Sequence, residues 1–314
     1  MAMLPRIAIP ASVTQGGICP PPLMAEALGH LHRSGIVVLT NAIDTQHIDV
    51  LNATVSDQAA TFARDPGQHF NFGVATGNIN QGPPLDRELL FHDVWMNPIV
   101  MSIVSAFLGP RPVLHYACGN TALPAAADGR QPVHSDIDFA HPQFPFSVVI
   151  NIPLVDMNEA NGATEVWLGS HIDTSLADQA LPTRRIVPEL VERRRLICPP
   201  TRCCAPRASI IIRDLRLWHA GQPNLTLKPR PMLAFVWSAA WWRGKGAIHL
   251  PLDVKPIVRA WEANMAVPIQ VAARWVDGPF DQRLNSIPNA EDTSLSSSDD
   301  ALLAMLSTQQ PSWH

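Results

Sequence analysis

The residues best able to do chemistry lie in two short segments, QPVHSDID (131–138) and LWHAGQPN (217–224). His134 and Asp136 are two positions apart, so on an extended strand or strand end their side chains lie on the same face. His219 follows 83 residues after Asp136, directly behind a short strand candidate. Two imidazoles and one carboxylate on one face leave three adjacent positions of an ion open, which suits Fe(II) with a chelating cosubstrate and O₂. The spacing therefore predicts a mononuclear iron site.

An arginine close behind this pattern strengthens the prediction. An H-x-D pair is common outside metal sites, and the chain has 12 histidines, so the pair alone decides little. Arg230 follows His219 by eleven positions and precedes the strand candidate 232–236. A lone arginine is usually a surface residue, but a guanidinium is also the natural bidentate partner of a carboxylate. One strand from an iron site, it would supply what the distal carboxylate of 2-oxoglutarate needs.

Two kinds of element are expected to position these residues. The first part of the chain carries helix patterns, and from Val113 short apolar stretches alternate with Gly, Pro and Asn turns. This order predicts a mainly β fold with flanking helices and a double-stranded β-helix core, of the jelly-roll or cupin-like kind. We expect helices at 23–32, 44–64 and 99–108, strands at 36–39, 113–118, 147–151, 165–168, 209–213 and 232–236, a surface insertion at 183–195 and a loose arm at 1–20.

Length and composition predict one folded unit. The chain has 314 residues, of which 46% are hydrophobic and 16% charged, as in a globule with a substantial core. We expect a single domain over 1–314, with a core at about 22–243 and a C-terminal extension at 244–314. The net charge of −4 gives no electrostatic footprint for nucleic acid or an anionic membrane surface.

The lack of a recognisable targeting signal and the pattern of cysteines predict a cytoplasmic protein. No apolar run approaches the roughly 20 residues of a membrane span, and the first residues, MAMLPRIAIPASVTQGG, lack the long apolar region of a signal peptide. The five cysteines are scattered and none forms a C-x-x-C pair, which is typical of an intracellular protein with reduced thiols. We therefore expect a small-molecule substrate and neither a nucleic-acid nor a membrane partner.

The motifs together resemble one known family. The chain is similar to the phytanoyl-CoA dioxygenase family in GIVVLTNAID (35–44), FLGP (107–110), PVHSDID (132–138), NEANGATEVWLGSH (158–171) and PRASIIIRDLRLWHAGQPNLT (206–226), followed by Arg230. The resemblance covers most of residues 22–243. The segment FNFGVATGNINQGPP (70–84) looks closest to the fungal secondary-metabolite branch of that family.

The resemblance implies a role for several residues. The three predicted metal ligands match the family's iron ligands. Arg230 matches the residue that pairs with the distal carboxylate of 2-oxoglutarate, Thr164 a hydroxyl that assists it, and Gln131 a residue near the other end of the cosubstrate. Some fungal relatives add an arginine in the region of GNINQ, where this chain has Asn78, Asn80 and Gln81 instead. The resemblance therefore implies Fe(II) as cofactor and 2-oxoglutarate as cosubstrate.

The expected reaction is oxidation of an unactivated C–H bond, with succinate and CO₂ as co-products. Hydroxylation, desaturation, ring expansion and epoxidation all remain open. Related iron halogenases replace the ligand carboxylate with Gly or Ala, so Asp136 argues against halide chemistry. A redox-neutral isomerase or hydrolase could use the same ligands, because zinc also accepts two histidines and a carboxylate. A non-catalytic jelly-roll binding protein is the third reading.

The expected substrate is a free, bulky, largely apolar natural product, because no basic patch suggests a handle for coenzyme A. We predict that it contacts Phe72, Asn78, Asn80 and Phe139, since polar, glycine-rich loops on a rigid scaffold often carry recognition. The tryptophans 237, 241 and 242 end the last core strand and could border the same pocket.

A homodimer is the remaining expectation. More than 70 residues follow Trp242, and they contain apolar stretches at 248–251, 254–261 and 266–275 that are costly to leave in water. These stretches must cover their own barrel, a second copy, or both. Several fungal relatives of the resembled family pair and lend a loop to the neighbouring site, and two identical copies most often pair with two-fold symmetry.

Overall fold

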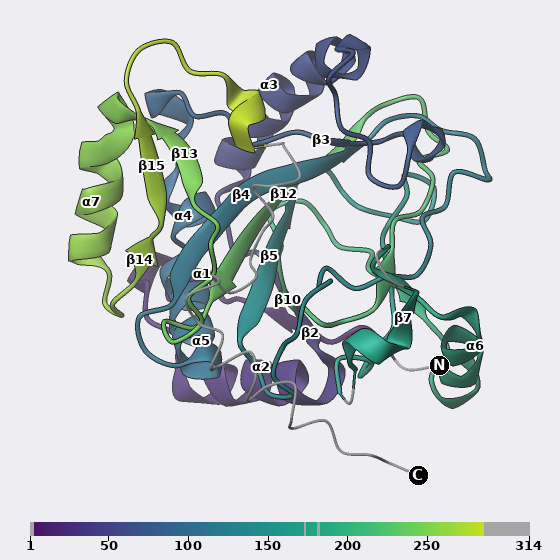
Figure 1. Ribbon diagram of the computed structural model, residues 1–314. Helices are drawn as coiled ribbons and strands as arrows, with labels where there is room; N and C mark the ends of the chain where they lie inside the picture. The colour runs from purple at the N-terminus through teal and green to yellow at the C-terminus, as the bar shows by residue number, and fades with distance from the viewer. Residues whose placement is uncertain (1–2, 173, 181–182, 286–314) are drawn as a thin grey trace.

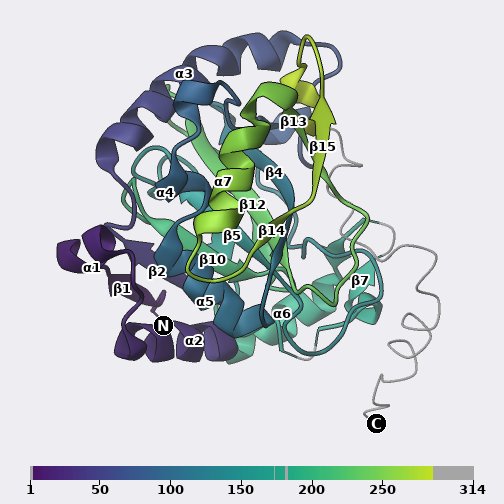
Figure 2. The ribbon, with the colours of Figure 1, turned by 90° about the vertical axis from the view of Figure 1, so that its left-hand side faces the viewer.

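The core of the molecule contains a larger and a smaller β-sheet. Helices cover the outer face of the larger sheet (Figures 1 and 2). This computed structural model describes residues 3–172, 174–180 and 183–285. The larger sheet consists of β1 (Arg6–Ala8), β2 (Ile36–Thr40), β3 (Asn78–Asn80), β4 (Val113–Ala122), β5 (Ser147–Pro153), β10 (Ile210–Asp214), β12 (Arg230–Ser238) and β14 (Gln270–Val271). Its order is β1-β2-β10-β5-β12-β4-β14, with β3 paired to β4.

The smaller sheet closes the opposite side of the barrel. It runs β11-β6-β9, built from β11 (His219–Ala220), β6 (Glu165–Val166) and β9 (Thr201–Arg202). The predicted mainly β fold with a jelly-roll core is confirmed. Two further pairs lie outside these sheets, β7 (Gln179–Ala180) with β8 (Arg185–Ile186) and β13 (Ile248–Pro251) with β15 (Ala273–Val276).

Local signals explain where the helices begin and end. The helices are α1 (Ala11–Gly16), α2 (Pro21–Ser34), α3 (Thr45–Arg64), α4 (His92–Trp95), α5 (Pro98–Leu108), α6 (Pro188–Ile197) and α7 (Lys255–Asn264). The side chain of Asp44 caps α3 by accepting from Gln46 N at 2.8 Å. Asn97 caps α5 in the same way, and α2 ends at Gly35 in the left-handed conformation. The predicted helices at 23–32, 44–64 and 99–108 therefore correspond to α2, α3 and α5.

The central strands are buried on both faces, because helices cover one face and the smaller sheet covers the other. Along β10, Ile210 and Ile212 belong to the core under the helices, whereas Ile211 and Arg213 line a pocket between the two sheets. This alternation is the normal two-residue period of a strand. The fold thus presents every second residue of β10 to the site.

The N-terminal arm forms a strand, β1, at residues 6–8, so the prediction of a loose arm at 1–20 is wrong for its middle part. Strand β1 pairs in parallel with β2, and Ile7 is 7% and Ile9 2% exposed. These two apolar side chains join the main core from the edge of the sheet. The sequence RIAI has the alternation of an edge strand, which the nearby prolines obscured.

The described part of the C-terminal extension covers its own barrel. Ile248, Leu250, Val258 and Trp261 belong to the main core cluster, with Val271 from β14. The predicted apolar stretches at 248–275 are therefore accounted for within one chain. Residues 286–314 lie outside the described part of the structure. Among the described residues, no helix has the length and apolarity needed to cross a membrane.

Candidate metal centre

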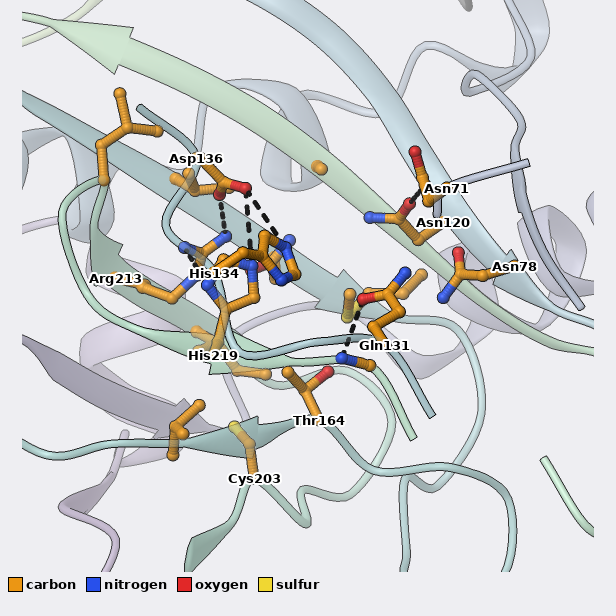
Figure 3. Close-up of a pocket in the computed structure, with 18 of the residues that line it drawn as sticks. Asn71, Asn78, Asn120, Gln131, His134, Asp136, Thr164, Cys203, Arg213 and His219 are labelled. Atoms are coloured by element: carbon orange, nitrogen blue, oxygen red, sulfur yellow. Dashed lines mark hydrogen bonds and ion pairs between the residues drawn. The ribbon is translucent and has the colours of Figure 1, made fainter. Parts of the chain in front are cut away.

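Three ligand-type side chains meet in the pocket between the sheets (Figure 3). His134, Asp136 and His219 each offer one ligand atom, and these atoms lie within 4.8 Å of one another. Asp136 Oδ1 is 3.5 Å from His219 Nε2 and 4.0 Å from His134 Nε2. An ion about 2 Å from each ligand atom fits such a triangle. The structure thus brings together the three residues that the sequence pattern selected.

The backbone holds the two histidines in register. His219 opens β11, and His134 lies in a loop that forms an isolated bridge with it. His134 N donates to His219 O at 3.0 Å, and His219 N donates to His134 O at 2.9 Å. The two segments, which lie far apart in the sequence, are therefore tied together independently of their side chains.

The imidazole tautomers are fixed by backbone carbonyls. His134 Nδ1 lies 2.9 Å from Pro132 O, and His219 Nδ1 lies 3.0 Å from Leu217 O. A carbonyl can only accept, so both Nδ1 atoms carry the hydrogen and both Nε2 atoms keep the lone pair that a metal needs. Burial, with the neighbouring His219, lowers the pKa of His134 to about 3, which keeps this imidazole neutral.

Asp136 is held by an arginine. Arg213 Nη2 donates to Asp136 Oδ2 at 2.6 Å. Burial by itself raises the pKa of Asp136, but the charge of Arg213 beside it outweighs burial and holds that pKa well below its usual range. The carboxylate is therefore ionised and available as a ligand.

Arg230 is a buried cation with a free donor. Its side chain is 1% exposed, and it donates only weakly to two backbone carbonyls, Gly162 O at 3.3 Å and Asn161 O at 3.4 Å. Nη1 is buried without a partner, and within the described residues no carboxylate lies at ion-pair distance from it. Burial lowers the pKa of Arg230 to about 10, so the group stays charged. An unpaired buried guanidinium is costly unless an anion joins it, so the pocket fits a carboxylate ligand.

Gln131 and Thr164 line the same pocket. Gln131 Oε1 accepts from Gly221 N at 2.8 Å, which leaves its Nε2 as the free donor. A Cβ at position 221 would lie 2.5 Å from Gln131 Oε1, so a larger residue there would displace the end of the Gln131 side chain. Thr164 accepts from Cys203 N through its backbone carbonyl at 2.8 Å, and its hydroxyl is left for other partners. The three residues expected around the cosubstrate thus share one pocket with the metal ligands.

Two of the four expected substrate residues line the pocket. The ring of Phe72 lies 4.4 Å from that of His134. Asn78 is 5% exposed, and its buried Oδ1 has no hydrogen-bond partner among the residues that the structure describes. Asn80 is not among the lining residues, and its Oδ1 instead accepts from Asn71 Nδ2 at 2.7 Å. Phe139 also lies outside the lining and packs against Trp242, with ring centroids 5.9 Å apart.

The walls of the pocket combine apolar and amide side chains. Trp237 and Trp242 are buried in the core, so the expected tryptophan border of the pocket is absent among the described residues. Asn71 Nδ2 donates to Asn120 Oδ1 at 2.5 Å, and Figure 3 shows these two beside Asn78. The apolar wall consists of Ile36, Val149, Met157, Val166, Ile211, Leu215, Met232, Ala234 and Val236.

Several lining residues escaped the sequence analysis, among them Asn71, Asn120 and Arg213. A signal was present for the last two, because each is a polar residue within an otherwise apolar strand pattern, in IIIRD and ACGNTA. Such residues face either solvent or a buried site, and only the covering helices show which. Asn71 lies in a loop and had no comparable signal.

Solved structures share this fold at low sequence identity. The non-heme alpha ketoglutarate dependent epimerase SnoN from nogalamycin biosynthesis matches with a TM-score of 0.54 at 14% identity, over 70% of this chain and 82% of that chain. EctD from S. alaskensis, solved with 2-oxoglutarate and 5-hydroxyectoine, matches at 0.55 and 16% identity, over 70% and 77%. AviO1 from Streptomyces viridochromogenes Tue57 matches at 0.53 and 19% identity, over 69% and 95%.

A protein-family match agrees with the geometry. The family described as phytanoyl-CoA dioxygenase (PhyH) matches residues 31–232, a span that contains all three candidate ligands and Arg230. The match covers more than half of the chain. The residues within it could hold iron and fit an anionic cosubstrate. The chain therefore belongs to the phytanoyl-CoA dioxygenase family and is an iron- and 2-oxoglutarate-dependent oxygenase.

Proposed function

We propose that this oxygenase oxidises an unactivated C–H bond of a bulky, largely apolar natural product, with succinate and CO₂ as co-products. The observation that carries the proposal is a His-Asp-His cluster in the same pocket as a buried arginine that has no counter-ion within the described part of the chain. Such an arginine has no purpose in a zinc hydrolase, and a plain binding protein has no need of the triad. The resemblance of segment 70–84 supports a place in the fungal secondary-metabolite branch.

Each residue of the pocket has a distinct proposed task. His134, Asp136 and His219 hold the iron, Arg230 with Thr164 binds the distal carboxylate of 2-oxoglutarate, and the amide N–H of Gln131 binds its other end. When bound, iron and 2-oxoglutarate would activate O₂, which is the oxidant: 2-oxoglutarate would supply two of the four electrons that O₂ takes up, in becoming succinate and CO₂, and the substrate C–H bond the other two. The protein's own part is to orient these groups and to keep water from the reacting centre.

The substrate side of the pocket is proposed to lie around Phe72 and Asn78. The apolar strand residues suit a bulky hydrocarbon skeleton, and the unpaired Asn78 Oδ1 suits a hydrogen-bond donor on it. Asn80 would act by holding Asn71, and Phe139 by packing behind the pocket.

A redox-neutral outcome is the second candidate. One protein of similar fold, SnoN, is a 2-oxoglutarate-dependent epimerase. The same ligand set and the same cosubstrate anchor would serve an epimerisation here. Analysis of the product, rather than of cosubstrate use, separates the two candidates.

The proposed metal site is tested by protein purified without oxygen. We expect one Fe(II) per chain and 2-oxoglutarate consumption that is lost in His134→Ala, Asp136→Ala and His219→Ala, because each removes one of three ligands. His30→Ala, which removes an ion pair with Glu26 on α2, is the matched control and should behave as wild type. Full activity in any of the three ligand variants, or turnover with zinc and no 2-oxoglutarate, contradicts the assignment.

We also propose a homodimeric, cytoplasmic enzyme. The five free cysteines fit a reducing compartment. The dimer rests on resemblance, because the apolar residues of the extension up to Val276 already cover their own chain. Sedimentation at micromolar concentration tests it. A chain ending after Asn285 keeps the two hydrogen bonds between Asn285 and His249, at 2.9 and 2.8 Å, so its oligomeric state reports on residues 286–314 alone.

A further inference from the structure

Arg213 is a buried charge on the pocket face of β10. It is 7% exposed and its neighbours across the sheet are Ile36 on β2 and Val149 on β5, which also line the pocket. A guanidinium among such side chains is costly unless it is paired. Its carboxylate partner is Asp136, at 2.6 Å.

The two oxygens of Asp136 face different groups. Oδ2 accepts from Arg213, whereas Oδ1 is the atom 3.5 Å from His219 Nε2 and 4.0 Å from His134 Nε2 (Figure 3). Charge-assisted bonds of this length are among the strongest in proteins. The arginine therefore occupies one oxygen and leaves the other toward the metal position.

The need for such a contact follows from the local backbone. Asp136 lies in a loop without regular structure, and its side chain is 30% exposed. Arg213 lies on β10, between β2 and β5 in the middle of the larger sheet, and its side chain is 8% exposed. A residue on a rigid strand thus orients a ligand that its own loop leaves free to rotate.

We propose that Arg213 is a positioning residue of the metal centre: by holding Oδ2, it would keep Oδ1 of Asp136 directed at the iron. Without this contact the carboxylate would be free to turn away from the ion, which would then be held firmly by only two of its three ligands. The inference rests on the proposed function, because it concerns the same metal.

Arg213 acts through Asp136 and not through His219. Its Nη1 lies 3.4 Å from His219 Nδ1, but that nitrogen already faces Leu217 O at 3.0 Å. In the metal-binding tautomer Nδ1 carries a hydrogen for the carbonyl, so it cannot accept from the arginine. His219 is oriented by its own backbone.

Arg213 also differs from the proposed cosubstrate anchor. Arg230 has a buried donor without a partner, whereas Arg213 is already paired with a carboxylate. The first arrangement suits an incoming anion, and the second suits a fixed contact inside the protein. Substitution of Arg213 should therefore affect metal binding, whereas substitution of Arg230 should affect 2-oxoglutarate binding.

The test compares Arg213→Met and Arg213→Lys with wild type as full-length protein. Three quantities are measured: the dissociation constant of Mn(II), that of 2-oxoglutarate at saturating Mn(II), and the visible spectrum of the Co(II)-loaded protein, which reports coordination. For Arg213→Met we expect Mn(II) binding to weaken about 10- to 100-fold and the Co(II) spectrum to change. The dissociation constant of 2-oxoglutarate should change less than about threefold, because Arg213→Met leaves Arg230 in place. Loss of the charge-assisted contact to Arg230 itself would change that constant by about tenfold or more.

Two further variants make the outcome decisive. Arg213→Lys keeps the charge and should fall between wild type and Arg213→Met, and it serves as the test if Arg213→Met does not fold. Arg207→Met removes an exposed ion pair with Asp49, 2.8 Å long, and should match wild type. Unchanged Mn(II) affinity and Co(II) spectrum in a folded Arg213 variant overturn the inference, as does a larger effect on 2-oxoglutarate than on metal. Wild-type protein that binds no Mn(II) overturns the proposed function first, and the inference with it.

Discussion

The ring of Phe72 lies against the imidazole of His134, with centroids 4.4 Å apart, and the backbone of Phe72 is in the left-handed region at φ 61°. A bulky residue seldom adopts this conformation, which costs about 1–3 kcal/mol and persists only where the surrounding structure enforces it. The position suggests that the ring shields the ligand from water at a conformational cost.

Phe72→Ala and Phe72→Gly separate these two effects. Both remove the ring, so both should raise 2-oxoglutarate consumption that yields no product, with iron content unchanged. Only glycine relieves the backbone, so Phe72→Gly should unfold in urea with a free energy about 1 kcal/mol above that of Phe72→Ala. Equal coupling of cosubstrate to product in wild type and both variants would show that the ring does not shield the site.

Replacing Arg230 should weaken the binding of 2-oxoglutarate without weakening the binding of the metal. Arg230→Met fills the same space without charge, and the lost charge-assisted contact is worth roughly 1.5–3 kcal/mol, or about ten- to a hundredfold in affinity. Calorimetric titration of 2-oxoglutarate into Mn(II)-loaded protein measures it, with Mn(II) affinity as the internal control. An unmoved 2-oxoglutarate constant means that the anion binds elsewhere.

A buried ion pair in the turn before His219 should dominate local stability. Arg216 and Asp214 are 2% and 1% exposed and are joined at 2.8 and 2.9 Å. Breaking such a pair leaves one charge buried and unpaired, so Arg216→Met should lower the free energy of unfolding by about 3–5 kcal/mol. The double variant Asp214→Leu with Arg216→Met should lose less, since no charge is left behind. Urea unfolding of both variants shows whether the loss of stability comes from an unpaired buried charge or from the change in side-chain volume.

Acid should destabilise the metal-free protein through its buried histidines. Burial lowers the pKa of His115, His141 and His171 below their unfolded value of 6.5. Between the lowered folded pKa and 6.5 the unfolded chain binds more protons than the folded one, so stability is complete above 6.5 and is lost as the pH falls. Urea midpoints at pH 7.5, 6.0 and 5.0 should decrease in that order. A His115→Gln variant with the same pH dependence as wild type would remove that residue from the explanation.

Much of the fold could be predicted from local sequence signals. Asp44 and Asn97 cap helices that begin where they indicate, and the apolar stretches at 36–39, 147–151 and 232–236 lie within β2, β5 and β12. These features depend on residues a few positions apart. The strand order does not, because β12 lies between β4 and β5 through hydrogen bonds to chain segments about 80 to 120 residues away.

The same distinction separates the predicted site residues. His134, Asp136, His219 and Arg230 could be proposed because their types and order are informative. Arg213 had only an ambiguous signal as a polar residue in an apolar strand, since its role depends on the loop carboxylate that the fold places beside it. Asn80 and Phe139 were expected at the pocket because their segments were polar or aromatic, but which side of a loop faces a cavity is decided by packing.

The insertion of β12 between β4 and β5 also bears on how the site comes into being during folding. β4 and β5 are made early, yet they do not pair with each other and must keep a place open until residues 230–238 are available. Pairing between such distant segments is slow, because the loop between them must close first. His134 and Asp136 are made before His219 and Arg230, so a growing chain that ends before β11 has two of the three candidate ligands but neither the third ligand nor the proposed cosubstrate anchor. The complete pocket for iron and 2-oxoglutarate would therefore form only when β12 takes its place between β4 and β5.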